Sequence, residues 1–206
     1  MDQSEHWKSQ EEKELKNSVS DFALKTYSFI MQKKYHNLLD LGCGRSLEPI
    51  FFADKGLIVK AIDISQNRLE SLRKYIQVSN LKNIHVECND IRNLPFDEIR
   101  YDVIYANLSL HYFDDKTTNE IFIKLYNILN SEGLLCIKTK STKDHSYGNG
   151  ELIEENMFDL NGHIRHYFDI HYMKKLLQSL HVISLEETFS INSNNKSAFI
   201  ECIARK

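Results

Sequence analysis

Several features that mark particular protein classes are missing from this 206-residue sequence. No apolar run approaches the ~20 residues of a membrane-spanning helix, and the N-terminus is polar and charged, so we expect neither a membrane association nor a signal peptide. The formal net charge is -3 and no basic stripe stands out. That balance disfavours a nucleic-acid partner, because phosphate backbones are bound by clustered lysine and arginine.

The cysteines also lack a pattern. Four are present, far apart and without the paired spacing that holds a metal ion. This favours reduced, mostly buried thiols and a cytoplasmic location. No internal repeat, low-complexity stretch or second domain is evident, so we expect one domain over residues 1–206. Its composition, 42% hydrophobic and 27% charged, is that of an ordinary globular protein.

What the sequence does contain is a glycine turn after a short apolar run, Asn-Leu-Leu-Asp-Leu-Gly-Cys-Gly at residues 37–44. Such a turn ends a parallel strand, opens a helix and lets a ligand approach the backbone closely. An acidic residue, Asp63, follows about 20 residues after Gly42. At that offset a nucleotide-binding fold places the carboxylate that holds two ribose hydroxyls.

Apolar strand-like runs alternate with helical patterns along the chain. We expect strands near residues 37–41, 57–64, 83–88, 101–107 and 134–140, and helices near 47–55, 65–79, 117–129 and 170–180. Residues 181–190 and 198–205 alternate like two antiparallel strands. An N-terminal arm, 1–35, contains one or two helices that either pack on the fold or cover a ligand. The alternation predicts an α/β fold with a parallel sheet covered by helices on both faces.

Polar residues stand at the end of four of these strands: Asp40, Asp63, Asp90 and Asn107. The carboxyl ends of parallel strands meet at the edge where such sheets bind ligands, so we expect one site there. A segment at residues 141–167 interrupts the alternation and is rich in aromatic and titratable side chains. We interpret it as an ordered insertion on the substrate side of that site.

The ligand class follows from two departures from a dinucleotide-binding pattern. Leu47 occupies the position of the third glycine, and the carboxylate of Asp40 beside the turn would repel a pyrophosphate. The same carboxylate would attract a cationic ligand. The run 39–44, Leu-Asp-Leu-Gly-Cys-Gly, resembles the first motif of the class I S-adenosylmethionine (SAM)-dependent methyltransferases, and the likeness extends over residues 36–140. The methyltransferases that this sequence resembles include small members of the tellurite-resistance and thiol methyltransferase type.

This resemblance implies a Rossmann-like, seven-stranded, mostly parallel sheet with an antiparallel C-terminal strand. It also implies a SAM site in which Asp63 binds the ribose and Ile64 packs on adenine. Asp90 and the amide of Ile91 then read the adenine edge. The methionine end is expected beside Asp40, Gly42, Cys43, Gly44, Asn107 and Leu108. Two of these roles have plain alternatives, since Asp63 can cap the helix that follows it and Asp90 can simply form a turn.

Candidates for catalysis are three histidines. His111 follows the fourth predicted strand, where the family places substrate-facing residues, and an ordinary imidazole pKa suits a general base. His163 and His166 in the insertion are candidates to face the same site. Tyr112, Tyr147 and Arg165 are candidate acceptor-binding residues. Each of these side chains has a structural alternative in ordinary packing or at the surface, and no spacing requires a metal.

The resulting hypothesis is a methyltransferase that moves a methyl group from SAM to a sulfur, oxygen or nitrogen atom of a small molecule and releases S-adenosylhomocysteine. A nicotinamide-dependent oxidoreductase and a non-catalytic SAM-binding protein are the alternatives. The acceptor and the choice between monomer and homodimer are left open by the sequence.

Overall fold

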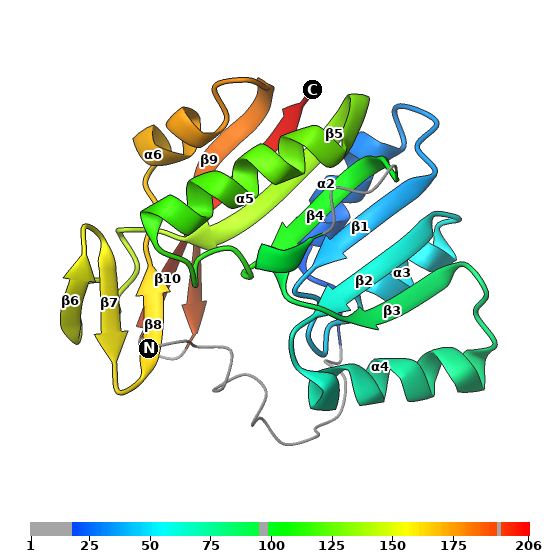
Figure 1. Ribbon diagram of the computed structural model, residues 1–206, viewed down its shortest axis with the longest axis horizontal. Coiled ribbons are helices and arrows are strands. Elements are labelled where there is room, and N and C mark those ends of the chain that lie inside the picture. Colours follow the sequence, from blue (N-terminus) through cyan, green and yellow to red (C-terminus); the bar gives the residue numbers. More distant parts are fainter. Residues whose placement is uncertain (1–17, 95–98, 193–194) are drawn as a thin grey trace.

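The computed structural model describes residues 18–94, 99–192 and 195–206 and arranges them around one seven-stranded sheet (Figure 1). The strand order is β3-β2-β1-β4-β5-β10-β9. The strands are β1 (Asn37–Leu41), β2 (Ile58–Asp63), β3 (Ile84–Cys88), β4 (Tyr101–Asn107), β5 (Leu129–Lys140), β9 (His181–Asn192) and β10 (Asn195–Arg205).

Strands β1 to β5 pair in parallel, whereas β10 is antiparallel to both of its neighbours, β5 and β9. The expected mostly parallel sheet with an antiparallel C-terminal strand is therefore confirmed. The chain builds outward from β1 to β3, then returns to β4 on the other side of β1. This reversal between β1 and β4 is the switch point at which open α/β sheets bind ligands.

Helices cover both faces of the sheet (Figure 1). One core forms beneath α5 (Asp115–Ile128) and α6 (Ile170–Leu176), together with the short 3-10 helix η1 (Ile91–Asn93). A second core forms beneath α2 (Asp21–Ile30), α3 (Glu48–Asp54) and α4 (Gln66–Ser79). In β1, Leu39 and Leu41 enter the first core and Leu38 the second. Because strand side chains alternate, Asp40 points to the side of α2 and α3.

Two element boundaries differ from the expectation in a way that matters for the site. β5 begins at Leu129, which pairs with Tyr101 across a register shift, so the strand extends further back than its apolar run. α5 begins at Asp115, and its N-terminus is capped by Asp114, which accepts a hydrogen bond from Thr117 N at 2.6 Å. His111 therefore lies in the turn between β4 and α5 and does not open the helix.

The described part of the N-terminal arm packs on the fold. Ser20 caps α2 by accepting a hydrogen bond from Ala23 N at 3.2 Å. Phe22 stacks on Tyr105 of β4 with ring centroids 5.4 Å apart, and Tyr27 meets Phe51 edge-on at 5.5 Å. Residues 1–17 lie outside the described residues. None of the described helices is long and apolar enough to cross a membrane.

The insertion forms a small antiparallel sheet of its own, ordered β6 (Glu151–Glu154), β7 (Met157–Leu160) and β8 (His163–His166). It stands beside the main sheet in Figure 1. Asn156 and Asn161 lie between these strands with positive φ, which asparagine adopts more readily than most residues. The sequence indicated order in this segment but not these strands.

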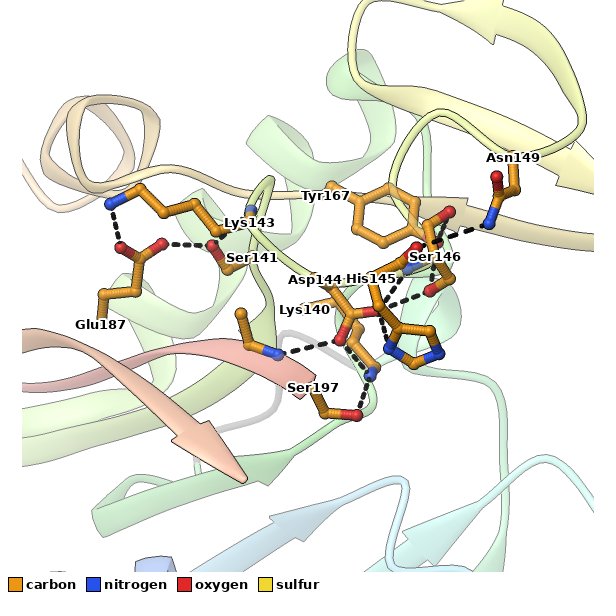
Figure 2. A network of polar contacts seen from close by, with 11 residues as sticks. Lys140, Ser141, Lys143, Asp144, His145, Ser146, Asn149, Tyr167, Glu187 and Ser197 are labelled. Carbon is orange, nitrogen blue, oxygen red and sulfur yellow. Dashed lines mark hydrogen bonds and ion pairs between the residues drawn. The ribbon is translucent and has the colours of Figure 1, made fainter. Parts of the chain in front are cut away.

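A buried aspartate ties the insertion to the main sheet (Figure 2). Asp144 accepts hydrogen bonds from Lys140 Nζ at 2.6 Å, Ser146 N at 3.0 Å and Ala198 N at 2.9 Å. Lys140 ends β5 and Ala198 lies in β10, so one carboxylate joins both strands to the first residues of the insertion. The insertion thus leaves the sheet at a fixed point.

Candidate functional site

The glycine turn after β1 is closed by hydrogen bonds to the neighbouring strand. The amides of Gly42 and Cys43 both donate to the carbonyl of Ile62, at 2.8 and 3.0 Å. Gly42 has a φ of +70°, and a Cβ placed on it would lie 2.4 Å from the Cβ of Ser109. Glycine is therefore required both for the backbone conformation and for the close approach of the segment after β4.

Asp63 at the end of β2 is bound to the same turn. Its Oδ2 accepts from Gly44 N at 2.9 Å and its Oδ1 from Ser65 N at 2.9 Å. Burial raises the pKa of Asp63, while these amides and the charges of Arg68 and Arg45 oppose the rise. Asp63 thus orders the turn and the start of α4, as its structural alternative anticipated. Each oxygen retains a lone pair for a further donor.

Behind the turn lie two carboxylates that have no cationic partner in residues 18–94, 99–192 and 195–206. Asp40 and Glu48 are each 2% exposed, and Asp40 Oδ2 and Glu48 Oε2 make no hydrogen bond within the described residues. Burial, followed by the charges of Glu48 and Asp63, raises the pKa of Asp40 well above its usual range. Buried carboxylates are ordinarily paired, so this arrangement leaves a demand for positive charge.

Asn107 and Ser20 complete this group from β4 and the cap of α2. Asn107 Nδ2 donates to Ser20 Oγ at 3.3 Å and to Glu48 Oε1 at 3.4 Å, while Asn107 Oδ1 is buried without a partner. Sequence reasoning identified Asp40 and Asn107 but missed Glu48. An acidic residue in a first helical turn is common because it complements the helix dipole. Only its burial distinguishes Glu48.

The segment after β4 has a strained backbone. Leu108 has a φ of +58°, a region that branched side chains rarely adopt, and its amide donates to Lys138 O at 2.8 Å. Strain of this kind concentrates at functional sites, where the surrounding structure enforces it. Leu108 and Asn107 stand at the switch point beside β1, where the sequence placed the methionine end of the ligand.

The edge predicted to bind adenine lies after β3. Asp90 caps η1 by accepting from Arg92 N at 2.9 Å, and its carboxylate is also paired with the Arg92 guanidinium at 2.6 Å. The turn-forming alternative therefore describes what Asp90 does within the chain, and an adenine contact stays a prediction. Ile64 is half-buried and Ile91 is buried in the core beneath α5.

His111 is buried in the turn that follows β4. It is 1% exposed, and its Nδ1 makes no hydrogen bond within the described residues. Burial, followed by the positive charges of Arg165 and Lys140, lowers the pKa of His111 well below its usual value. The ring is therefore neutral at neutral pH. Its carbonyl accepts from His166 N at 3.0 Å, which fixes β8 against this turn.

The expectation that His163 and His166 face one site needs correction. Both lie in β8, where residues three apart point to opposite faces. The ring of His163 meets Tyr112 with centroids 5.8 Å apart. The ring of His166 packs on Phe168 and Tyr172, and its Nδ1 lies 3.1 Å from the carbonyl oxygen of Phe113. Only His163 shares a face with the predicted acceptor-binding residues.

Arg165 shares the face of His163. The strand partner of Arg165 is Phe158. Burial raises the pKa of Tyr112, and the nearby charge of Arg165 opposes that rise. Tyr147 packs edge-on against Phe158 at 5.3 Å and donates to Asn156 Oδ1 at 2.8 Å. The structure thus brings Arg165 near Tyr112 and places Tyr147 on the strand partner of Arg165. No group of three histidine, cysteine, aspartate or glutamate side chains suited to a metal ion occurs among the described residues.

Comparison with known proteins supports the geometry. A family described as a methyltransferase domain matches residues 38–133, which include the glycine turn, Asp63, Asp90 and Asn107. Over this stretch, the resemblance to the class I SAM-dependent methyltransferases is confirmed. A ubiquinone biosynthesis O-methyltransferase from Coxiella burnetii is 26% identical over 134 residues, covering 55% of this chain and 57% of that protein. The chain thus spans little more than half of this curated relative.

Solved methyltransferase structures share the fold. TehB from Haemophilus influenzae superposes with a TM-score of 0.73 at 18% identity, covering 93% of this chain and 63% of that one. A 1,6-didemethyltoxoflavin-N1-methyltransferase from Burkholderia thailandensis, with bound 1,6-didemethyltoxoflavin and S-adenosylhomocysteine, gives a TM-score of 0.71 at 15% identity, covering 90% and 76%. At these identities the likeness establishes the methyltransferase fold alone.

Proposed function

We propose that this protein is an enzyme that binds SAM and transfers its methyl group to a small-molecule acceptor. One observation carries the proposal: Asp40 and Glu48 are buried carboxylates that form no ion pair with a cation among the described residues, and they lie beside a glycine turn at the switch point of the sheet. A ligand with an ammonium and a sulfonium charge would satisfy them, whereas a pyrophosphate would be repelled. The match of residues 38–133 to a methyltransferase domain agrees with this ligand.

The residues around the turn fit the parts of SAM. Asp63 would bind the ribose diol through its remaining lone pairs, with Ile64 against adenine and Asp90 and Ile91 at the adenine edge. The methionine end would lie over Gly42, Cys43, Gly44 and Leu108. Its ammonium group would be held by Asp40, Glu48 and the free oxygen of Asn107.

SAM would supply an electrophilic methyl group, and its transfer leaves S-adenosylhomocysteine. The chain itself has to position the acceptor, exclude water and, where the acceptor is protonated, accept a proton. Orientation alone contributes up to roughly 7–11 kcal/mol in favourable systems. His111 is the candidate proton acceptor, because its ring is neutral and buried in the turn after β4. The low pKa of His111 suits an acceptor that is itself acidic.

Acceptor binding is assigned to the face of β8 that carries His163 and Arg165, together with Tyr112 and Tyr147. His166 contributes by fixing this strand to the turn of His111 through its backbone amide, and its ring lies on the other side.

Binding measurements test the proposal directly. Calorimetric titration with SAM, S-adenosylhomocysteine and NAD should give micromolar or tighter binding for the first two only. Tight NAD binding without SAM binding would replace the proposal with an oxidoreductase. Incubation with methyl-labelled SAM and an acceptor panel then tests transfer. His111→Ala is expected to lower turnover while leaving SAM affinity within about twofold, because the ring lies outside the proposed SAM contacts.

A further inference from the structure

His166 and His111 lie in different electrostatic surroundings. The groups around His166 are acidic: after burial and the Phe113 carbonyl, its pKa is influenced by Glu154, Asp115 and Asp114. The charges that act on His111 are positive: after burial, Arg165 and Lys140 and then the other two histidines lower its pKa. The insertion therefore places the charge of Arg165 near His111 and Tyr112.

Of the two permanent cations near His111, one is neutralised. Lys140 Nζ lies 2.6 Å from Asp144 Oδ2, so that pair carries no net charge. Arg165 has no ion pair with a carboxylate among the described residues, and its charge opposes the rise in the pKa of Tyr112 that burial causes. Within the part of the chain that the structure describes, Arg165 Nε and His111 Nδ1 are each buried without a hydrogen-bond partner. Each of these nitrogens is therefore open to a hydrogen bond with a ligand.

Tyr112 relates this arginine to the proposed SAM site. The side chain of Tyr112 interacts with Arg165 in the insertion and also lies within the electrostatic reach of Asp63 and Arg68. Its ring packs at a tilt against His111, with centroids 4.3 Å apart, and meets His163 edge-on. Tyr112 therefore lies near both Arg165 and Asp63, the carboxylate proposed to bind the ribose. A methyl acceptor held beside Tyr112 would be close to the proposed SAM site.

We propose that the methyl acceptor carries a carboxylate on a small planar skeleton and that Arg165 binds this carboxylate. This inference rests on the proposed function and specifies its substrate class. The guanidinium group matches a carboxylate with two parallel hydrogen bonds, and an anion satisfies the uncompensated charge of Arg165. The planar part would lie against Tyr112 and Phe158, the strand partner of Arg165.

Three probes of one shape and different charge test this inference. Benzoate, benzamide and benzamidine are titrated calorimetrically into the protein saturated with S-adenosylhomocysteine. We expect benzoate to bind at least about tenfold more tightly than benzamide and benzamidine not to bind. Arg165→Gln should weaken benzoate binding at least about tenfold, and Arg165→Lys should restore only part of it, because ammonium lacks the fork geometry. Arg100→Gln, at an exposed arginine before the start of β4, is the matched control.

The affinity for S-adenosylhomocysteine, measured first for every variant, separates the possible failures. Suppose that S-adenosylhomocysteine binds all variants equally. If benzoate then binds no better than benzamide, or if Arg165→Gln leaves benzoate binding unchanged, the carboxylate inference is overturned and the proposed function stands. If S-adenosylhomocysteine does not bind the wild-type chain, the proposed function fails. The benzoate titration repeated without it still decides the role of Arg165.

Discussion

Asp40 and Glu48 together carry a negative charge that no described lysine, arginine or histidine neutralises by an ion pair. Each residue is 2% exposed and has one oxygen without a partner among the described residues, and the charge of Glu48 adds to the burial that raises the pKa of Asp40. Proteins tolerate such an arrangement where a ligand compensates for it, and this is the usual origin of a conflict between stability and function. The pair therefore carries more functional information than the exposed acids of the same sequence.

Asp63 has a structural and a proposed ligand role that mutation can separate. Asp63→Ala should weaken SAM binding at least about tenfold, since two ribose hydroxyls lose their acceptor. It should also lower the thermal midpoint, because the amides of Gly44 and Ser65 lose theirs. Asp63→Asn keeps one acceptor oxygen and should recover most of the midpoint but not the affinity. Calorimetry and thermal melts measure both, with the exposed Asp54→Asn as control. An unchanged affinity in Asp63→Ala would remove this residue from the site.

The glycine turn is the element on which the site depends. Gly42→Ala places a methyl group 2.4 Å from Ser109 Cβ and requires a φ of +70° from alanine. We expect a loss of roughly 2 kcal/mol or more in unfolding free energy, together with loss of SAM binding. Gly148→Ala is the matched control, because it also has a positive φ but nothing within 4 Å of the added Cβ. Denaturant unfolding measures both variants, and equal losses would show that the approach of Ser109 is unimportant.

The hydrogen bonds of Asp144 hold the insertion to the main sheet. Burial by itself would raise the pKa of Asp144, but the hydrogen bonds from Lys140, Ser146 and Ala198 lower it to about 2. A depressed carboxyl pKa stabilises the fold above the unfolded value, ~3.9, and this stabilisation is lost as the pH falls toward 2. Asp144→Asn should therefore cost about 2 kcal/mol near neutral pH. Urea unfolding should show wild type and variant converging between about pH 4 and pH 2, whereas a constant difference would contradict the assignment.

How much of the fold and of the site could be predicted from the sequence depended on the kind of element. The buried parallel strands β1 to β4 were predictable because each is a short apolar run that ends in a turn, and their polar ends located the site. The strands β6 to β8 were not, because each has only four residues and polar side chains interrupt their apolar positions, which leaves no clear hydrophobic period in the sequence. The opposite orientation of His163 and His166 follows from β8 alone. Glu48 was missed because burial, unlike charge, depends on the packing of distant elements.

At the level of the whole molecule, the proposed ligand contacts come from the main sheet, from one of its helical layers and from the insertion. Asp40 comes from β1, Asp63 from β2, Asn107 from β4 and Glu48 from α3, while Arg165 comes from the insertion. The parallel sheet brings the strand ends to one edge, and the Asp144 contacts hold the insertion at that edge. Binding there should stabilise the entire fold by mass action, by about 2.7 kcal/mol at a ligand concentration of 100 Kd.

The pH dependence of that stabilisation reports on the buried carboxylates. Because the pKa of Asp40 is raised in the folded chain, the ligand-free protein binds a proton there more tightly than the unfolded chain does, and it loses stability as the pH rises through that pKa. A cationic ligand favours the carboxylate instead, so SAM binding should release protons and strengthen as the pH rises.

Calorimetry at one pH in phosphate and in Tris, which differ in ionisation enthalpy, gives the number of protons released. Asp40→Asn should reduce both the release and the affinity without lowering the thermal midpoint of the free protein, since it removes a buried charge whose Oδ2 has no partner among the described residues. Proton release that is identical in Asp40→Asn would mean that the cation of the ligand is held elsewhere.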